Sequence, residues 1–540
     1  MTQIKLTIPT RNDLPDPRIE TRPTELRRFL EQLPYTDPIK TCGIVSEELA
    51  ALNRQRLTPQ VRLPLVELYR QTFRKLIQLQ SRLLRAGIAV RQSRKANESL
   101  AALSRLAREL SFAFKIVVTD RMAEGGIRSA DRILQASILR AIKFLGLEQL
   151  FSFHSYAPAS SHVWGELNQL YALALEHGLA DNAYIDDENS SLPSSSITHI
   201  YKQIALTARS DPYHLGNGEA WKVYDFLDRW AELGKITRPA KGPRKNGQFL
   251  IDLEGTSAPQ PLNSEAVEID SDRHRILDTH DLAQWIDDQI RELEVGNRAA
   301  EAGIHLELPT QEIVRVLRYL MLSWWHCPTR QHERRERLSW VEGVCGLNSA
   351  HEVLKEDAEL AAESHLHKDD SIEISTSGAM RRPTGIRVQQ ERWRLINHST
   401  GGVALSVRLP CNPAMRVGQL IIFRNPASSQ ENWLLGVIRW LSQEQEDEIN
   451  VGVQYLSDHA KPVIVRDTSG DTVRSIAALE IEIRQADRPL PPQLVTPHGI
   501  YQPQKESVIK SGDGQIRIRA SKLIEATSSL DRFYFERIKG

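Results

Sequence analysis

Three arginines near the middle of the chain have the types and spacing to bind an anion. Arg330 and Arg334 stand four residues apart in the segment R-Q-H-E-R-R-E-R, and Arg335 follows directly. A guanidinium is a planar fork of donors that pairs bidentately with a phosphate or with the O6/N7 edge of guanine. Its flat face also stacks on bases. The pattern therefore indicates one side of a site for an anionic ligand.

A second polar pattern, Asn-x-Ser-x-x-Gly, lies about 60 residues downstream at Asn397, Ser399 and Gly402. The asparagine amide offers both a donor and acceptors, and the serine offers a compact hydroxyl. Glycine lets the backbone turn sharply and approach a ligand closely. The same pattern is also typical of an ordinary hairpin turn, so the order of the two patterns and the strands around them decide the interpretation.

Strand signals surround the second pattern and would position it. Short apolar runs with turn residues between them predict a small antiparallel barrel, with additional strands towards the C-terminus. The predicted strands are Leu338–Leu347, Arg392–Asn397, Val403–Leu409, Gln419–Phe423, Trp433–Leu441 and Ile449–Tyr455, then Ala478–Ile483, Gly499–Gln502, Gln515–Arg519 and Phe533–Ile538. Residues 350–390 are polar and are interpreted as an insertion that must loop out.

Helical periodicity dominates the N-terminal half, where apolar residues recur at steps of three and four. We expect a multidomain α plus β protein: an irregular helical domain followed by the barrel and further strands. The predicted divisions are an extended arm over 1–60, a helical domain over 61–236, an α+β connector over 237–308, a barrel with an entering helix over 309–456, and a β-rich segment over 457–540.

The region from Arg330 to Leu456 resembles the PilZ family of cyclic di-GMP receptors. That family carries an R-x-x-x-R element before a six-stranded barrel and a [D/N]-x-S-x-x-G element on the strand and turn that follow. Arg330 and Arg334 match the first element, while Asn397, Ser399 and Gly402 match the second. The runs R-V-G-Q-L-I-I-F, W-L-L-G-V-I-R-W and V-G-V-Q-Y-L resemble the later barrel strands.

The resemblance implies a receptor without enzymatic activity that binds cyclic di-GMP through Arg330, Arg334, Arg335, Asn397, Ser399 and Gly402. It implies no cofactor or metal. Ligand binding would order the arginine segment and change the domain arrangement. The helical domain would then contact a protein partner in motility, pili or surface attachment.

Composition excludes several classes. Lys+Arg and Asp+Glu both number 69, so a globally basic nucleic-acid binder is disfavoured. No apolar run approaches the roughly 20 residues of a membrane span, and the N-terminal residues lack the apolar region of a signal peptide. Four scattered cysteines suit neither a disulfide framework nor a zinc motif and indicate a reducing cytoplasm. They are Cys42, Cys327, Cys345 and Cys411.

Several alternatives stay open on the sequence. Arg381, Arg382 and Arg387 lie closer to the second pattern, although their spacing does not match the family element. The barrel could act purely as an adaptor without binding nucleotide. An enzyme with a site among the helices would require convergent acid, base or nucleophile groups, and none stands out. Nucleic-acid binding would require a continuous basic face along residues 62–95.

Overall fold

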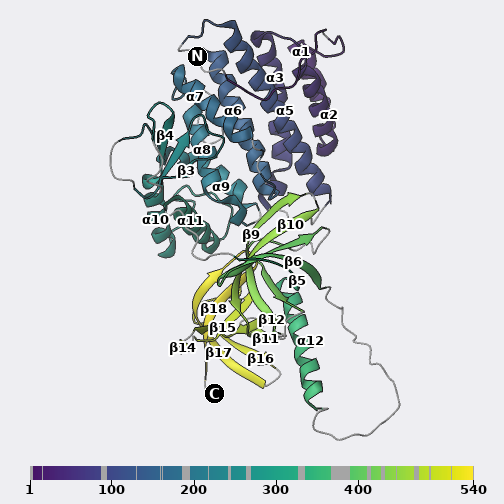
Figure 1. Ribbon diagram of the computed structural model, residues 1–540, viewed down its shortest axis with the longest axis vertical. Helices are drawn as coiled ribbons and strands as arrows, with labels where there is room; N and C mark the ends of the chain where they lie inside the picture. The colour runs from purple at the N-terminus through teal and green to yellow at the C-terminus, as the bar shows by residue number, and fades with distance from the viewer. Residues whose placement is uncertain are drawn as a thin grey trace, which may run out of the picture. The chain divides into compact units, whose positions relative to one another are not determined.

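The structure of the protein is a computed structural model, shown in Figure 1. It describes the chain apart from residues 1–3, 15, 87–93, 129–130, 159, 161, 185–194, 217, 241–244, 263–268, 326–334, 367–389, 410–414, 427–431, 446, 468–473, 486–487, 490, 512–513 and 539–540. The chain divides into two compact units, Met1–Thr329 and Arg330–Gly540. The first is mainly helical and the second is mainly β.

Helices α1 to α11 form most of the first unit. They are α1 Pro23–Glu31, α2 Pro38–Asn53, α3 Pro59–Leu79, α4 Ser81–Ala86, α5 Arg94–Glu124, α6 Arg132–His154, α7 His162–Glu176, α8 Ile197–Arg209, α9 Glu219–Trp230, α10 His280–Glu294 and α11 Thr310–Trp325. Polar side chains cap several N-termini: Asp131 accepts from the Leu134 N–H and Ser196 from the His199 N–H.

Helix α6 is the centre of this unit. Nearly every residue from Leu134 to His154 is buried, because α3, α5, α7, α8 and α9 all pack around it. Phe144 contributes to two aromatic pairs, with ring centroids 5.4 Å from Phe73 and 5.8 Å from Phe114. A helix that is apolar on all sides must be covered on all sides, which explains the clustering of the others around it.

Residues 1–60 differ from the predicted extended arm. They contain α1 and also α2, which was not expected. Helix α2 begins at Pro38, with Asp37 as its cap, and buries small and polar side chains such as Thr41 and Ser46 beside Val45 and Leu49. Its apolar stripe is weak in the sequence because these short side chains replace larger apolar ones where helices approach closely.

The predicted connector is part of the helical unit's core. A four-stranded antiparallel sheet of order β1-β4-β2-β3 lies within it, and its apolar residues join the same hydrophobic cluster as the helices. The strands are β1 Lys235–Thr237, β2 Gln248–Asp252, β3 Gln260–Pro261 and β4 His274–Asp278. Helix α11, expected to accompany the barrel, also packs here: the buried Trp324 indole donates to the Leu206 carbonyl at 3.0 Å.

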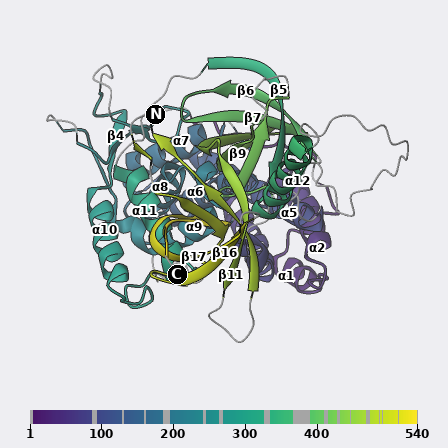
Figure 2. The same cartoon turned by 90° about the horizontal axis from the view of Figure 1, so that it is seen from below.

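The second unit begins with a closed antiparallel barrel of cyclic strand order β10-β7-β6-β5-β8-β9. Its strands are β5 Arg335–Cys345, β6 Glu391–His398, β7 Gly402–Arg408, β8 Leu420–Arg424, β9 Leu434–Gln445 and β10 Glu448–Ser457. Strands β5, β6 and β7 are seen side by side in Figure 2. Helix α12, Leu347–Leu366, follows β5. The interruption between β5 and β6 leaves their pairing intact.

The C-terminal strands form a second closed barrel, where the sequence predicted only additional strands. Its order is β11-β12-β15-β18-β17-β16. The strands are β11 Ala460–Asp467, β12 Arg474–Ile481, β15 Gln493–Pro497, β16 Glu506–Ser511, β17 Gly514–Ala526 and β18 Leu530–Arg537, and the short pair β13 Arg484–Gln485 and β14 Arg488–Pro489 lies outside the barrel. The predicted strand Gly499–Gln502 is instead a turn, because Gly499 has a φ of +83°.

One hydrophobic cluster joins the two barrels. Leu420 and Val437 of the first barrel share it with Leu479 and Leu530 of the second, and α12 adds Val353. Polar contacts accompany this core: the buried Thr527 hydroxyl donates to the Gly418 carbonyl at 2.7 Å. Arg439 also pairs with Glu525, which Arg532 approaches at 3.3 Å. The second unit is therefore a packed double barrel.

Candidate site at the barrel rim

The pairing of β5 with β6 brings Arg335 and the Asn397–Gly402 turn to the same end of the first barrel. Arg335, the first residue of β5, lies opposite His398, and Glu336 lies opposite Asn397. The side chain of Arg335 is exposed. Arg330 and Arg334 lie outside the described residues.

Backbone hydrogen bonds close the turn that follows Asn397. The Ser399 N–H donates to the Gly402 carbonyl at 2.8 Å, and the Gly401 N–H donates to the Ser399 hydroxyl at 3.3 Å. Strand β10 supports the loop, since the Tyr455 N–H donates to the Gly401 carbonyl at 3.1 Å. These contacts fix the position of Ser399 at the rim of the barrel.

Asn397 keeps its side-chain amide available for a ligand. The residue is half-buried, and no residue that the structure describes forms a hydrogen bond with this amide. Ser399 is half-buried too, and its hydroxyl lies 3.4 Å from the Gly402 carbonyl, which is a weak contact. Both side chains can therefore bind an added molecule while giving up little or no hydrogen bonding within the protein.

Gly402 is required by a close approach of two strands. A Cβ at this position would lie 2.2 Å from the Val453 carbonyl oxygen of β10. Gly402 is not among the residues with positive φ. The reason for glycine is therefore the space that the β10 backbone occupies, which differs from the sharp turn that the sequence suggested.

Irregular pairing marks the strands beside the turn. The register between β6 and β7 shifts between Leu395 and Asn397, and that between β5 and β6 shifts between Glu336 and Ser339. A bulge bends a strand and changes the direction of the side chains beyond it. Both irregularities adjoin the residues of the two patterns, at the place where a barrel would need to present side chains at its rim.

Other arginines of the first barrel already have acidic partners. Arg394 donates to Glu448 at 2.5 Å, and the Ser406 hydroxyl donates to the same carboxylate. The hydrogen bonds from Ser406 and Arg394 hold the pKa of Glu448 below its ordinary value. Arg424 likewise contacts Glu342 at 3.3 Å. The exposed Arg335 is thus better placed than these to meet an external anion.

Strands β9 and β10 add two residues next to the turn that the sequence patterns did not indicate. Gln454 pairs across the ladder with Gly402, and its side-chain oxygen accepts from Arg439 Nε at 2.7 Å. Arg439 continues to Glu525 of the second barrel. Local sequence contains no signal for this arrangement, because it depends on the register of strands about 50 residues apart.

A family model described as "Cyclic-di-GMP receptor FimW, middle PilZ domain" matches residues 355–462. Residues 355–462 therefore belong to the PilZ-domain family of cyclic di-GMP receptor proteins. The matched range contains the PilZ barrel strands β6 to β10 and the Asn397–Gly402 turn. It also contains Arg381, Arg382 and Arg387, which lie outside the described residues, whereas β5, Arg330 and Arg334 precede it.

Two further family models cover the regions on either side. The FimW N-terminal domain matches residues 24–241, and the FimW C-terminal beta-barrel domain matches residues 469–538. A protein named "Cyclic-di-GMP receptor FimW" from Pseudomonas aeruginosa is 21% identical, over 96% of this chain and 90% of its own length. The similarity therefore extends over the helical unit and both barrels in the same order.

The described part of the chain holds neither a membrane-spanning helix nor a cluster of metal-ligating side chains. No described helix is both long and apolar enough to cross a membrane. Within the same residues, no group of three or more His, Cys, Asp or Glu side chains is arranged to hold a metal ion. Cys42 and Cys345 are buried, and Cys327 and Cys411 lie outside the described residues.

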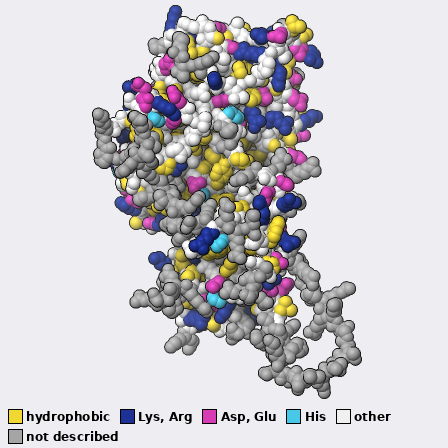
Figure 3. All heavy atoms as spheres, viewed as in Figure 1, with side chains coloured by type: hydrophobic (Ala, Val, Ile, Leu, Met, Phe, Trp, Pro, Cys, Tyr) yellow, Lys and Arg dark blue, Asp and Glu magenta, His cyan; other side chains and the backbone are white. Residues whose placement is uncertain are grey.

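The predicted basic face along residues 62–95 is interrupted where it is described. Arg62 is buried and donates to the Leu52 carbonyl at 3.1 Å, Arg70 pairs with Glu67, and Lys75 lies over the Tyr35 ring. Acidic side chains are interspersed with basic ones on the face of the helical unit seen in Figure 3. These pairings weaken the nucleic-acid alternative, since they occupy part of the charge that it would use.

Proposed function

We propose that the protein is a non-enzymatic cytoplasmic receptor that binds cyclic di-GMP at the rim of the PilZ barrel. The ligand would lie between Arg330, Arg334 and Arg335 on one side and Asn397, Ser399 and Gly402 on the other. The observation that supports this proposal is the pairing of Arg335 with His398, because Arg335 directly follows Arg334 in the chain and His398 directly precedes Ser399.

The chemistry of the ligand matches these groups. Cyclic di-GMP has two anionic phosphates and two guanine bases, and arginine forks bind both kinds of group. The amide of Asn397 can donate to and accept from a guanine edge. The Ser399 hydroxyl and the backbone N–H groups of the turn supply short contacts where the glycine leaves no side chain in the way.

Isothermal titration of the full chain with cyclic di-GMP tests this proposal. Each bidentate arginine contact contributes about 1–3 kcal/mol, so Arg330→Ala/Arg334→Ala should weaken binding by at least roughly tenfold. Ser399→Ala should weaken it less. Arg392→Ala is the matched control, because Arg392 is an exposed arginine of β6 whose guanidinium lies 5.7 Å from the Trp340 ring.

The competing arginines require their own variant. If Arg381→Ala/Arg382→Ala/Arg387→Ala abolishes binding while Arg330→Ala/Arg334→Ala does not, the arginine assignment is wrong although the receptor function stands. If the unsubstituted chain gives no binding heat and no other sign of binding, the receptor proposal fails. An adaptor that acts through protein contacts alone would then be the better description.

The arginine segment also gives the proposal a route to signalling. Residues 326–334 connect α11, which ends at Trp325 in the helical unit, with β5, which begins at Arg335. A ligand held by Arg330 and Arg334 would restrain this connection and thereby change the arrangement of the two units. The helical unit would then offer a changed surface to a protein partner in motility, pili or surface attachment.

Limited proteolysis and solution scattering test this second step. Saturating cyclic di-GMP should slow tryptic cleavage after Arg330 and Arg334 and should change the small-angle scattering profile of the full chain. At a lower ligand concentration that only part-fills the site, both effects should be smaller in Ser399→Ala, in proportion to its lower occupancy. Unchanged cleavage and unchanged scattering with the ligand fully bound would contradict the proposed rearrangement.

A further inference from the structure

The helical unit contains a cavity of about 740 Å³ that the barrel site does not use. Helices α3, α6 and α9 and the segment 303–307 line it, and we call it the aromatic cavity. The aromatic side chains in its lining are Phe73, Phe144, Trp221, Tyr224, Phe226 and Trp230. The described residues that line it all belong to the first unit.

Three buried donors in its wall have no partner among the residues that the structure describes: the indole N–H groups of Trp221 and Trp230 and the Tyr224 hydroxyl. Trp221 is 5% exposed and Tyr224 is 7% exposed, and neither the indole N–H nor the phenol hydroxyl forms a hydrogen bond there. A nearby polar side chain is satisfied, since Gln203 Nε2 donates to the Tyr224 carbonyl at 2.8 Å. An indole N–H can only donate. These three groups therefore favour a ligand that brings acceptor atoms.

Charge adds a second requirement. Basic side chains in the lining outnumber acidic ones, with Arg70, Arg74, Lys143, Lys222 and Arg229 against Asp225, Asp228 and Glu307. Arg229 also lies over the Trp230 ring, 5.1 Å from its centroid. An anion is favoured by this excess of positive charge. A flat ring is favoured by the aromatic side chains and by arginine.

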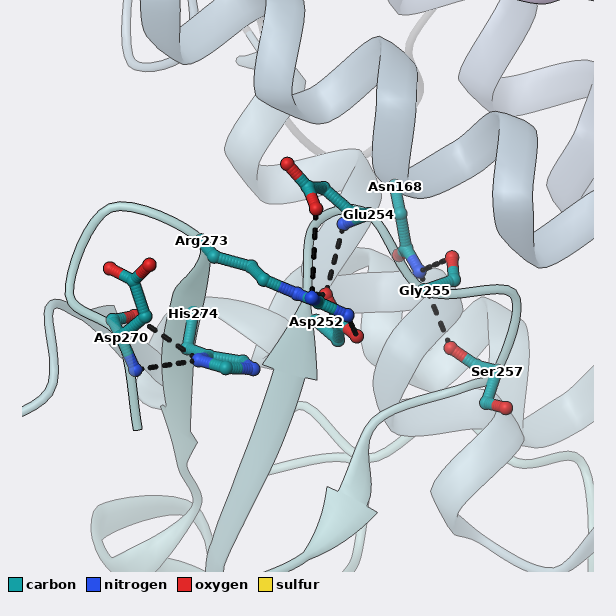
Figure 4. A network of polar contacts seen from close by, with 8 residues as sticks. All are labelled: Asn168, Asp252, Glu254, Gly255, Ser257, Asp270, Arg273 and His274. Carbon is teal, nitrogen blue, oxygen red and sulfur yellow. Dashed lines mark hydrogen bonds and ion pairs between the residues drawn. The ribbon is translucent and has the colours of Figure 1, made fainter. Parts of the chain in front are cut away.

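A second cavity in the same unit provides the contrast. It measures about 760 Å³ and lies beside α7, α8 and the four-stranded sheet. One of its basic lining side chains is already paired: Figure 4 shows Arg273 directed to Asp252 and Glu254, at 2.7 and 3.6 Å. Tyr171 in its wall has Thr198 as a partner at 3.4 Å. The described residues that line this cavity include no comparable set of unpartnered donors.

We propose that the aromatic cavity binds a small organic anion with an aromatic body. The ring would pack on the aromatic lining, acceptor atoms would take the Trp221 and Tyr224 hydrogens, and the acidic group would face the basic side chains. A volume of about 740 Å³ lies within the range of small-molecule sites. This inference does not depend on cyclic di-GMP binding at the barrel.

Fluorescence titration of the full chain with 8-anilinonaphthalene-1-sulfonate tests the proposal, because this probe is an aromatic anion. We expect saturable binding of one probe per chain. Trp221→Phe and Tyr224→Phe keep an aromatic ring and remove the donor, so each should weaken binding at least fivefold. Lys143→Met should do the same through charge. Tyr171→Phe, in the second cavity, is the matched control and should bind as the unsubstituted chain does.

Three further measurements distinguish the aromatic cavity from nonspecific adsorption and from the barrel site. N-phenyl-1-naphthylamine, which lacks the sulfonate, should bind at least tenfold more weakly. Saturating cyclic di-GMP should leave the probe bound. Tyr224→Phe should not lower the melting temperature of the free protein, since it removes an unpartnered hydroxyl, so its weaker binding cannot come from unfolding. The proposal would be overturned if the probe did not bind saturably, or if all three cavity variants bound it as tightly as the unsubstituted chain. Displacement of the probe by cyclic di-GMP would also overturn it.

Discussion

Replacing Gly402 by alanine would force a methyl group against the backbone of β10. The new Cβ would stand 2.2 Å from the Val453 carbonyl oxygen, whereas ordinary contact begins at 3.4 Å. The two strands would therefore have to separate by about 1.2 Å at this point. The neighbour is backbone and not the end of a flexible side chain, so a rotamer change cannot relieve the contact.

The size of the effect follows from what that separation disturbs. Gly402 pairs with Gln454 and Val403 with Val453, and the Tyr455 N–H bonds to Gly401 next to them. Two weakened hydrogen bonds remove about 1–2 kcal/mol, and overpacking adds about 1–3 kcal/mol. We expect Gly402→Ala to destabilise the β7–β10 ladder by about 2–5 kcal/mol.

Hydrogen exchange followed by mass spectrometry is the appropriate assay, because a chain of two units does not have a single free energy of unfolding. Amides of β7 and β10 should exchange roughly 30-fold faster or more in Gly402→Ala. Gly43→Ala is the control: a Cβ there meets nothing within 4 Å, and alanine favours helix α2 by about 1 kcal/mol. Exchange in β7 and β10 within roughly threefold of the unsubstituted rate would refute the close-approach argument.

Two predictions concern buried charge in the helical unit. Lys115 Nζ contacts Glu166 at 2.7 Å with both side chains buried, so Lys115→Met should destabilise this unit by about 3–5 kcal/mol. Urea unfolding should show that adding Glu166→Gln to Lys115→Met restores much of the lost stability. If Glu166→Gln instead caused a second, additive loss, the pairing would be contradicted. Burial lowers the pKa of His154 from 6.5 to about 4. The unfolded chain therefore takes up the proton first as pH falls, and up to roughly 3 kcal/mol of stability present above pH 6.5 is lost by about pH 4. Melting curves across this window should flatten in His154→Leu but not in His177→Leu, and equal slopes in both variants would show that His154 is not responsible.

Sequence patterns predicted the PilZ barrel well because its strands alternate clearly. Val403–Leu409 and Ile449–Tyr455 lie within one or two residues of β7 Gly402–Arg408 and β10 Glu448–Ser457. Alternation reports which face of a strand is buried, and in a barrel one face of every strand is buried. Long helices such as α5 were equally clear, since their apolar stripes are continuous over many turns.

Closure of the second barrel could not be read from the sequence. Strand β11 closes it by pairing Ile464 with Lys510 of β16, which is a contact between residues far apart in the chain. The sequence also did not show that α11 belongs to the helical unit. Its apolar stripe, which includes Trp324, predicts that the helix is packed on one side, but not which element it packs against. Propensity and periodicity describe local structure, whereas these features depend on long-range register.

Some features of the candidate site could likewise be predicted from the sequence, and others could not. Asn397, Ser399 and Gly402 were recognisable as a turn, and the structure adds the hydrogen bonds that hold it closed. The reason for glycine at residue 402 was not recognisable, because it is the Val453 carbonyl on another strand. The ligand contacts of Arg330 and Arg334 remain a prediction that titration can decide.

The core shared by the two barrels constrains how this part of the chain can change over generations. Val437 belongs to the first barrel, yet it packs in one cluster with Leu479 and Leu530 of the second. A substitution in either barrel must therefore suit the packing of both, because a close-packed interior leaves little room for a change in volume. A recombinant between relatives would therefore fold best when both barrels come from the same parent sequence.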